Sequence, residues 1–539
     1  MIKLPKHLLQ ILALGIAVQA CSTLGQQPIT ETLGVSTILA EAHQTASGIT
    51  DLKLKDEGLG FIAIFQAIAN DYRSAQETSL LIQDSRWRDW ALAQIGGIQA
   101  RSGDIRSAKA LAARLENSWA KEEIESDIAI SLATLGQFPE AIQIASDITD
   151  ESLRTLALLN IVVQLAESSN FERAERIAGM IPDRTGLKDE ISDVLDSPTR
   201  SQGYAYIAEL LTKKHQRSEA LRILQLIVDP VEQGIAVKAL VGASLESDNY
   251  AQTWEVLKSV GEEARTCGLI YLAMHYARKG NVNKGLEVVH SIDSTQGSAR
   301  CTHFPGATLT LGPITRQSLV LMAAVKGGHT RKAQMTAEGL SAEEGRDHAR
   351  VSIAIAQARD GDPEGGLNTI SKLSTQHSVE GLKEIALAYA KAGMRIQGLQ
   401  IANRIESKEL REETQGQMVF HLANAGDTDG ALRILQDLPD EKNKMFAFIA
   451  IAEAQATAGN YMDALGTAQL VQQAHDRVIV TGKVATIVAN NGNVHDTLTW
   501  VREIPDPHQR LYGLLGVAKA LLARSGEKEN TRDFPTHFR

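Results

Sequence analysis

Helix-breaking positions recur along the chain at an almost constant interval. They are Asn70, Gly103, Gly136, Ser169, His215, Asp248, Gly280, Gly328, Gly361, Gly393, Gly426, Gly459, Gly492 and Gly526. Eleven of the thirteen intervals measure 32 to 34 residues, and the other two measure 46 and 48. A fixed period in this range is typical of arrays built from one repeated supersecondary unit.

The residues around each break predict a helical hairpin. Eight positions before it stands an aliphatic residue, such as Ile95 or Ile128, and twelve positions after it stands another, such as Ile148. Five positions after it the residue is small, as at Ala108 and Ala141, which lets two helices approach closely. At helical spacing these positions predict an amphipathic helix A, a tight turn and a shorter helix B.

Polar residues mark the junction between each helix B and the next helix A. Asp84, Asp150 and Asp506 are N-cap candidates, because their oxygens can accept hydrogen bonds from first-turn amides. A base follows four positions later, as at Arg88 and Arg154. We interpret each cap and base as an i to i+4 ion pair, with a functional basic stripe as the alternative.

The two long intervals indicate insertions at about 184–199 and 295–312. Both replace a connection from helix B to helix A, so both emerge from one edge of the array. The first carries acids at helical rather than calcium-loop spacing, and we interpret it as a solvated helical loop.

Cys301 lies in the second insertion, and Cys267 lies near the start of the preceding helix A. The two cysteines therefore come from the same side of one repeat. In an oxidising compartment this placement favours a disulfide that closes the inserted loop. A metal site that adds His303 is one alternative, although no fourth ligand is evident, and two inert thiols are the other. We predict the disulfide, and no metal or other cofactor.

The N-terminus has the pattern of an export signal. Two lysines precede an apolar run at 8–18, and small residues follow. Residues 18–21, Val-Gln-Ala-Cys, resemble a bacterial lipobox, which predicts lipidation of Cys21. Ser22 after the cysteine favours a periplasmic protein anchored to the outer membrane. A plain secreted protein and a retained signal are the alternatives.

Charge and motifs limit the classes of function. The net charge of -10 disfavours nucleic acid as a partner. No later stretch approaches the ~18 apolar residues that cross a bilayer, so a lipid would be the only membrane anchor. Phosphate-loop, zinc-protease, nucleophile-elbow and Cys-x-x-Cys motifs are absent from the sequence, and we expect no enzyme.

The unit resembles the tetratricopeptide repeat. The likeness rests on an aliphatic-then-small pair in helix A, as in Ile128-Ala129, on the glycine turn and on the small residue five positions later, and it covers about residues 55–525. The chain departs from the family by lacking the usual tyrosine in helix A and by ending helix B early. The resemblance implies an all-α, right-handed α–α superhelix of about 13 helix-turn-helix repeats with a C-terminal capping helix. It also implies a concave groove that binds peptides or partner helices.

Four consecutive repeats carry a base two positions before the turn, at Arg278, Lys326, Arg359 and Lys391. In a tetratricopeptide-like groove this row faces the interior, which gives the hypothesis of a basic track that binds acidic peptide segments or an anionic glycan. The alternative is that these cations stabilise the C-terminal ends of their helices.

These patterns divide the chain into a signal peptide (1–20), a tether (21–52) with a short helix at about 31–44, a solenoid (53–525) and a disordered tail (526–539). The predicted function is a non-enzymatic scaffold of the bacterial cell envelope that binds one or more partner proteins. The alternatives are a periplasmic binder of anionic polysaccharide and an α/α-toroid enzyme acting on polysaccharide. A toroid would close a ring of about six or seven hairpins and use aromatic platforms, whereas only 4% of these residues are aromatic.

Overall fold

The computed structural model of the chain describes residues 34–182, 199–292, 300–304, 307–310, 313–340, 343–371, 373, 375–439 and 444–524. The predicted signal peptide, Cys21, nearly all of the first insertion and the tail at 526–539 lie outside these residues.

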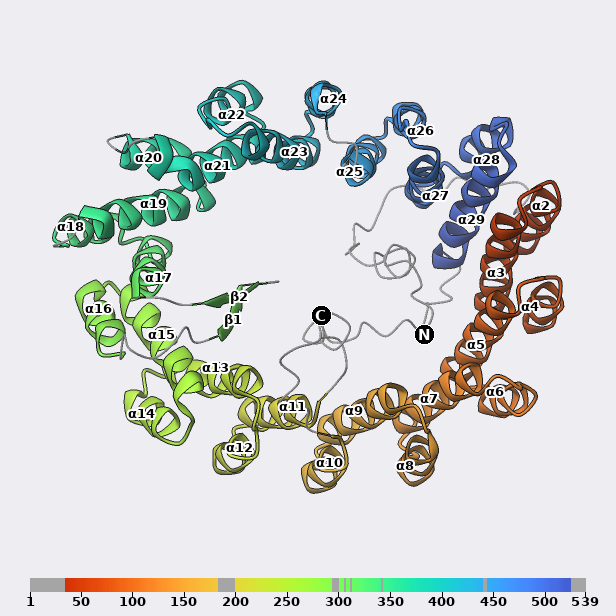
Figure 1. Cartoon of the computed structure of the whole chain (residues 1–539), viewed down its shortest axis with the longest axis horizontal. Coiled ribbons are helices and arrows are strands. Elements are labelled where there is room, and N and C mark those ends of the chain that lie inside the picture. The colour runs from red at the N-terminus through yellow and green to blue at the C-terminus, as the bar shows by residue number, and fades with distance from the viewer. Residues whose placement is uncertain are drawn as a thin grey trace. The chain divides into compact units, whose positions relative to one another are not determined.

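Most of the described residues form thirteen helical hairpins and a final helix, with one helix before them and one short β-hairpin between them (Figure 1). The A helices are α3 (Leu52–Ile68), α5 (Ser85–Arg101), α7 (Ser118–Thr134), α9 (Glu151–Glu167), α11 (Arg200–Lys213), α13 (Pro230–Glu246), α15 (Glu262–Arg278), α17 (Pro313–Lys326), α19 (Glu343–Arg359), α21 (Thr375–Lys391), α23 (Lys408–Asn424), α25 (Lys444–Thr457) and α27 (Ala474–Asn490). The B helices are α4 (Tyr72–Ser79), α6 (Ile105–Ala112), α8 (Phe138–Asp147), α10 (Phe171–Ala178), α12 (Arg217–Leu224), α14 (Tyr250–Lys258), α16 (Val282–His290), α18 (Thr330–Glu338), α20 (Pro363–Ile370), α22 (Arg395–Ala402), α24 (Thr428–Asp437), α26 (Tyr461–Gln469) and α28 (Val494–Glu503). The final helix is α29 (Pro507–Arg524). The predicted all-α solenoid of helix-turn-helix repeats is therefore confirmed.

The predicted breaks are the turns between helix A and helix B. Gly136, with φ of 76°, and Asn70, with φ of 62°, adopt the left-handed conformation that ends a helix. The turn at Gly136 is closed by hydrogen bonds from its own amide to Ala133 and from Gln137 to Leu132. Glycine dominates these positions because it adopts positive φ at no steric cost.

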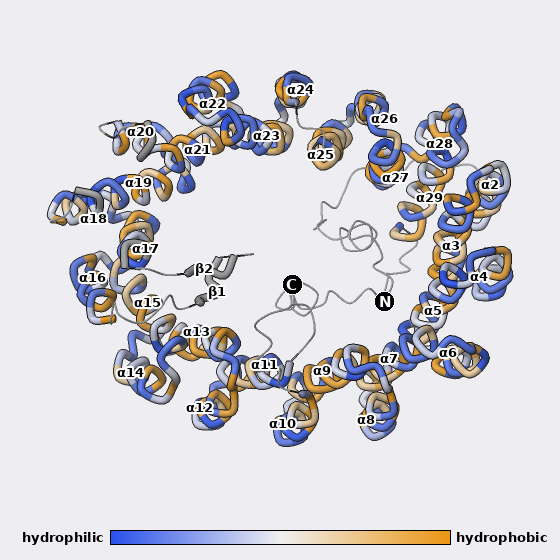
Figure 2. The backbone as a smooth tube through the Cα atoms, viewed as in Figure 1, coloured by the Kyte–Doolittle hydropathy of each residue, from blue (hydrophilic) through white to orange (hydrophobic). Residues whose placement is uncertain are grey.

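The small residue after each turn allows helix B to lie against the backbone of helix A. A β-carbon placed on Gly285 would lie 2.7 Å from the carbonyl oxygen of Ala273, and one on Gly366 would lie 2.9 Å from that of Ala354. Hydrophobic residues gather where helices face one another, and hydrophilic residues cover the outer sides of the B helices (Figure 2). Consecutive A helices also pack on one another, and buried residues form one core cluster from Ala63 to Tyr276 and a second from Cys267 to Ala356.

The second insertion contains a short antiparallel hairpin, which we did not predict. Its strands are β1 (Arg300–Phe304) and β2 (Ala307–Thr310), and Arg300 pairs with Thr310. β1 contacts α13 and α15. Threonine-rich segments around a Pro-Gly pair favour such a hairpin, but the segment occurs only once, so no repeat pattern revealed it.

The first and last helices of the described chain pack together. The short helix that we expected within the tether, at about 31–44, is α2 (Val35–Ser47), and α2 and α3 both contact α29. Arg502 makes two hydrogen bonds to Glu41, at 2.7 and 2.9 Å, and the hydroxyl of Tyr512 donates to Glu57. Helix α2 is stabilised because its apolar face packs on α29. The predicted C-terminal cap therefore joins the end of the array to its beginning.

Candidate binding surface

An arginine closes many of the junctions between a helix B and the next helix A. Arg88 donates to the carbonyl oxygen of Ile82 at 3.0 Å, and Arg154 donates to that of Ile148 at 2.9 Å. Equivalent bonds to the carbonyl six positions earlier are made by Arg346, Arg411, Arg477 and Arg510. The last carbonyls of a helix lack intrahelical partners, and these side chains satisfy them.

The ion pairs that we predicted at these junctions are wrong for Arg88 and Arg154. Asp84 and Asp150 do cap their helices, and each accepts from first-turn amides. The bases bind backward to helix B instead. Carbonyl oxygens at the end of helix B have no partner within the helix, so they compete well for the guanidinium against a carboxylate that water already solvates.

Ion pairs connect neighbouring A helices on the side turned away from the B helices. We call this side the A-helix face, and its residues include Arg359 of α19 and Glu384 of α21. Arg359 donates two hydrogen bonds to Glu384, at 2.7 and 3.0 Å. Arg101 and Asp127 form the corresponding pair between α5 and α7 at 2.6 Å. Arg359, a member of the predicted basic row, is thus exposed but already paired.

The other three bases of the row, Arg278, Lys326 and Lys391, are also exposed. All four lie in the last turn of their helices, a position that suits both of our interpretations. Burial and then the charge of Lys391 lower the pKa of His421 on the next A helix. Ligand binding by the row stays a prediction.

Glu123 of α7 is a half-buried acid that we did not single out from the sequence. Burial, and then the charge of Asp127, raise its pKa to about 7. Gln94 donates to its Oε1 at 2.9 Å, while Oε2 is buried without a hydrogen-bond partner. The one signal of Glu123 in the sequence is that a carboxylate stands at a position of helix A that is apolar in another repeat. The corresponding residue of α9 is Leu156.

Cys267 is buried on α15 and is disulfide-bonded. The side chain of Cys301, its predicted partner, lies outside the described residues, as does that of His303. The backbone of β1, which contains Cys301, contacts α15. The Cys267–Cys301 pairing stays a prediction, and these two observations agree with it.

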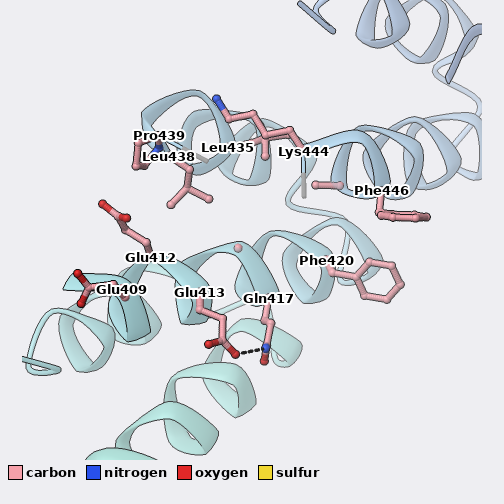
Figure 3. Close-up of a pocket in the computed structure, with 12 residues that line it drawn as sticks. Glu409, Glu412, Glu413, Gln417, Phe420, Leu435, Leu438, Pro439, Lys444 and Phe446 are labelled. Carbon is pink, nitrogen blue, oxygen red and sulfur yellow. Dashed lines mark hydrogen bonds between the residues drawn. The ribbon is translucent and has the colours of Figure 1, made fainter. Parts of the chain in front are cut away.

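A cleft of about 750 Å³ opens between α23 and α25. Its apolar lining comes from Leu435, Leu438 and Pro439 at the end of helix B and from Phe420 and Phe446 on the A helices. Figure 3 shows the two phenylalanine rings projecting in the same direction at one end of the cleft. The carboxylates of Glu409 and Glu412 lie toward the other end, and Lys444 lies on the opposite wall. The cleft therefore has an aromatic end and an acidic end.

The cleft exists because a space that a side chain fills beside Gly60 is open beside Gly416. At Gly60 the equivalent space is occupied by Trp90 of the next A helix, 3.3 Å from a β-carbon placed on the glycine. At Gly416 the nearest atom is Cδ1 of Leu438 at 3.8 Å, and Phe446, which corresponds to Trp90, remains 41% exposed. Gly482 stands at the same position two repeats later, and there a β-carbon would lie 3.1 Å from the carbonyl oxygen of Tyr512.

Sequence analysis missed this cleft. One departure from the adjacent repeats marks it: Lys444 stands at the junction position that Arg411 and Arg477 occupy there. Gly416 gives no signal of its own, because Gly60 and Gly482 hold the same position in their repeats. A cleft also depends on where Phe446 points, which the pattern does not determine.

Within the described ranges, His, Cys, Asp and Glu side chains form no group of three or more able to hold a metal ion. In the same part of the chain, no helix has the length and apolar character needed to cross a membrane.

No protein-family model matches the chain. No curated protein matches its sequence. Among solved structures, it is similar to Ton1535 from Thermococcus onnurineus NA1, with 13% identity and a TM-score of 0.23, over 74% of this chain and 99% of that one. It is similar to yeast Tom70, with 13% identity and a TM-score of 0.24, over 84% and 99% of the two chains. It is also similar to a circular tandem repeat protein with novel repeat topology, with 14% identity and a TM-score of 0.10, over 91% and 97%. The fold assignment therefore rests on the helical hairpins themselves.

Proposed function

We propose that this chain is a non-enzymatic scaffold of the bacterial cell envelope that binds one or more partner proteins on its A-helix face. The observation that carries the proposal is the A-helix face itself, where thirteen repeats present side chains that are not buried in the core. Side-by-side repeats produce an extended surface of this kind, and helical-repeat surfaces bind peptides and helices.

The proposed location follows from the sequence of the N-terminus. Export through the segment at 1–20 and a lipid on Cys21 would hold the chain at the outer membrane, facing the periplasm. Oxidising conditions in that compartment fit the disulfide at Cys267. Tetratricopeptide-like binding is part of the same proposal, with acidic peptide segments as ligands of the row at Arg278, Lys326, Arg359 and Lys391.

Charge reversal in the row tests the proposal. Lys326→Glu with Lys391→Glu changes two exposed members of the row, neither of which has a salt bridge within the described residues. We expect crosslinking in intact envelopes, followed by purification of this chain, to recover at least about fivefold less partner protein, and the loss to grow as salt is lowered. Fractionation of the same envelopes records whether the chain sediments with outer membranes, as a lipid anchor requires.

A charge-matched control separates the row from a general effect of net charge. Lys258→Glu with Arg433→Glu makes the same change at exposed positions on the B helices α14 and α24. Equal recovery of partner by the wild type, the row variant and the control would contradict binding at the row.

A further inference from the structure

We propose that the cleft between α23 and α25 binds a cationic amphipathic segment of a partner protein. A bulky apolar side chain of this segment would lie beside Phe420 and Phe446, and its Lys or Arg side chains would face Glu409 and Glu412. The inference rests on the proposed function, because it assumes that the A-helix face binds protein segments. It adds a site whose charge is opposite to that of the basic row.

The apolar end of the cleft requires an apolar occupant. Phe420 and Phe446 are 49% and 41% exposed, and their rings project from adjacent A helices on the same side (Figure 3). Leu435 and Leu438 extend the apolar lining inward. Exposed aromatic groups next to a concave apolar surface are the usual anchor points of protein interfaces. A volume of about 750 Å³ is large enough for several side chains of a bound segment.

The acidic end determines the charge of the occupant. Glu413 is paired with Lys383 at 2.7 Å, which uses most of its charge. Glu412 lies 3.8 Å from Lys408, at the limit of an ion pair, and the carboxylate of Glu409 accepts a hydrogen bond from Ser407. Glu409 has no salt bridge within the described residues. Three carboxylates and one ammonium, that of Lys444, line the cleft, so complementarity favours a cationic segment.

Gly416 allows the cleft to be filled without damaging the fold. Its φ is not in the left-handed region, and a β-carbon there makes only an ordinary contact at 3.8 Å. Leucine is also a better helix former than glycine. Gly416→Leu should therefore close the cleft and leave α23 at least as stable. Gly466→Leu is the matched control, because Gly466 is exposed on α26 with nothing within 4 Å of an added β-carbon.

The experiment measures binding of three labelled helical peptides to the full mature chain by fluorescence anisotropy. The first peptide has leucines along one side and lysines along the other, the second replaces the lysines with glutamates, and the third replaces the leucines with serines. We expect the Leu/Lys peptide to bind at least about tenfold more tightly than either of the others. Gly416→Leu should weaken its binding at least about tenfold, and Gly466→Leu should leave it within about twofold. Glu409→Lys with Glu412→Lys should weaken it most at low salt.

Three results would overturn the inference. They are no binding of the Leu/Lys peptide by the wild type, equal binding by the wild type and Gly416→Leu, and preference for the Leu/Glu peptide. None of these outcomes alters recovery of partner in the envelope experiment with Lys326→Glu and Lys391→Glu. Failure of the cleft and failure of the scaffold function are therefore distinguishable.

Discussion

Single arginines connect consecutive repeats at their junctions. The Arg154 guanidinium donates to the carbonyl oxygens of Ile148 and Thr149, at 2.9 and 3.3 Å, and so fixes the end of α8 against the start of α9. The sequence predicted the position of this base but not its partner. A base four residues after a cap is also six residues after the last aliphatic residue of helix B. Spacing alone therefore does not show whether the base binds the carboxylate of the cap or the carbonyl oxygen of helix B.

We predict that Arg154→Gln destabilises the α8–α9 junction by about 1–2 kcal/mol, because two carbonyl oxygens lose their donor. Native-state hydrogen exchange of the α8 and α9 amides measures this opening free energy. Arg73→Gln is the control, since Arg73 is 89% exposed and, in the part of the chain that the structure describes, forms one ion pair, with Glu77. Its effect should stay within about 0.5 kcal/mol. Equal effects of the two substitutions would mean that the junction bond contributes nothing.

Glu123 should make the stability of the α5–α7 region depend on pH. Its folded pKa of about 7 lies above the usual value of 4.5, so the folded chain binds more protons between these values. Stability is then lost as the pH rises from about 4.5 to 7. We predict that Glu123→Gln stabilises α7 at pH 8, by on the order of 1–3 kcal/mol, and that the gain shrinks toward pH 4. Hydrogen exchange of α7 at both pH values tests this, and a gain independent of pH would show that the carboxylate is not the cause.

Helical hairpins were predictable because each of their features occurs thirteen times. The turn at Gly136, the aliphatic residue at Ile128 and the small residue at Ala141 all lie where the columns place them. Helix α2 and the β1–β2 hairpin occur once and have no column to identify them, so the bounds of α2 were expected only approximately and the hairpin was not expected. Helix α29 carried a signal that we did not use. Its buried residues surround the whole helix, as expected for a helix covered on every side rather than an exposed cap.

We predict that deletion of residues 35–47 exposes α29, although α2 and α29 lie at opposite ends of the sequence. Removal of α2 uncovers apolar surface on α29 and removes the partner of Arg502. Amide protection in α29 should fall by on the order of 100-fold, while α9, in the middle of the array, should be unaffected. If α29 kept its protection, the contact between the first and last helices would not exist in solution.

At the scale of the whole molecule, we propose two binding surfaces, the basic row and the cleft, and only the row could be located from the sequence. The basic row was predictable because Arg359 and Lys391 occupy one column. The pairing of Arg359 with Glu384 was not, since it joins two repeats whose relative rotation the sequence does not give. The cleft beside Gly416 depends on the direction of Phe446, which leaves open a space that Trp90 fills beside Gly60, and this direction becomes visible only when repeats are packed in space.

Photocrosslinking in intact cells tests most directly whether the A-helix face is the binding surface. A photoreactive phenylalanine analogue at Phe420 lies on this face, and the same analogue at Met462 lies on the B helix α26, where the native side chain is 69% exposed. We predict discrete protein adducts from position 420 and none from position 462. Adducts from position 462 alone, or none from either position, would contradict the account.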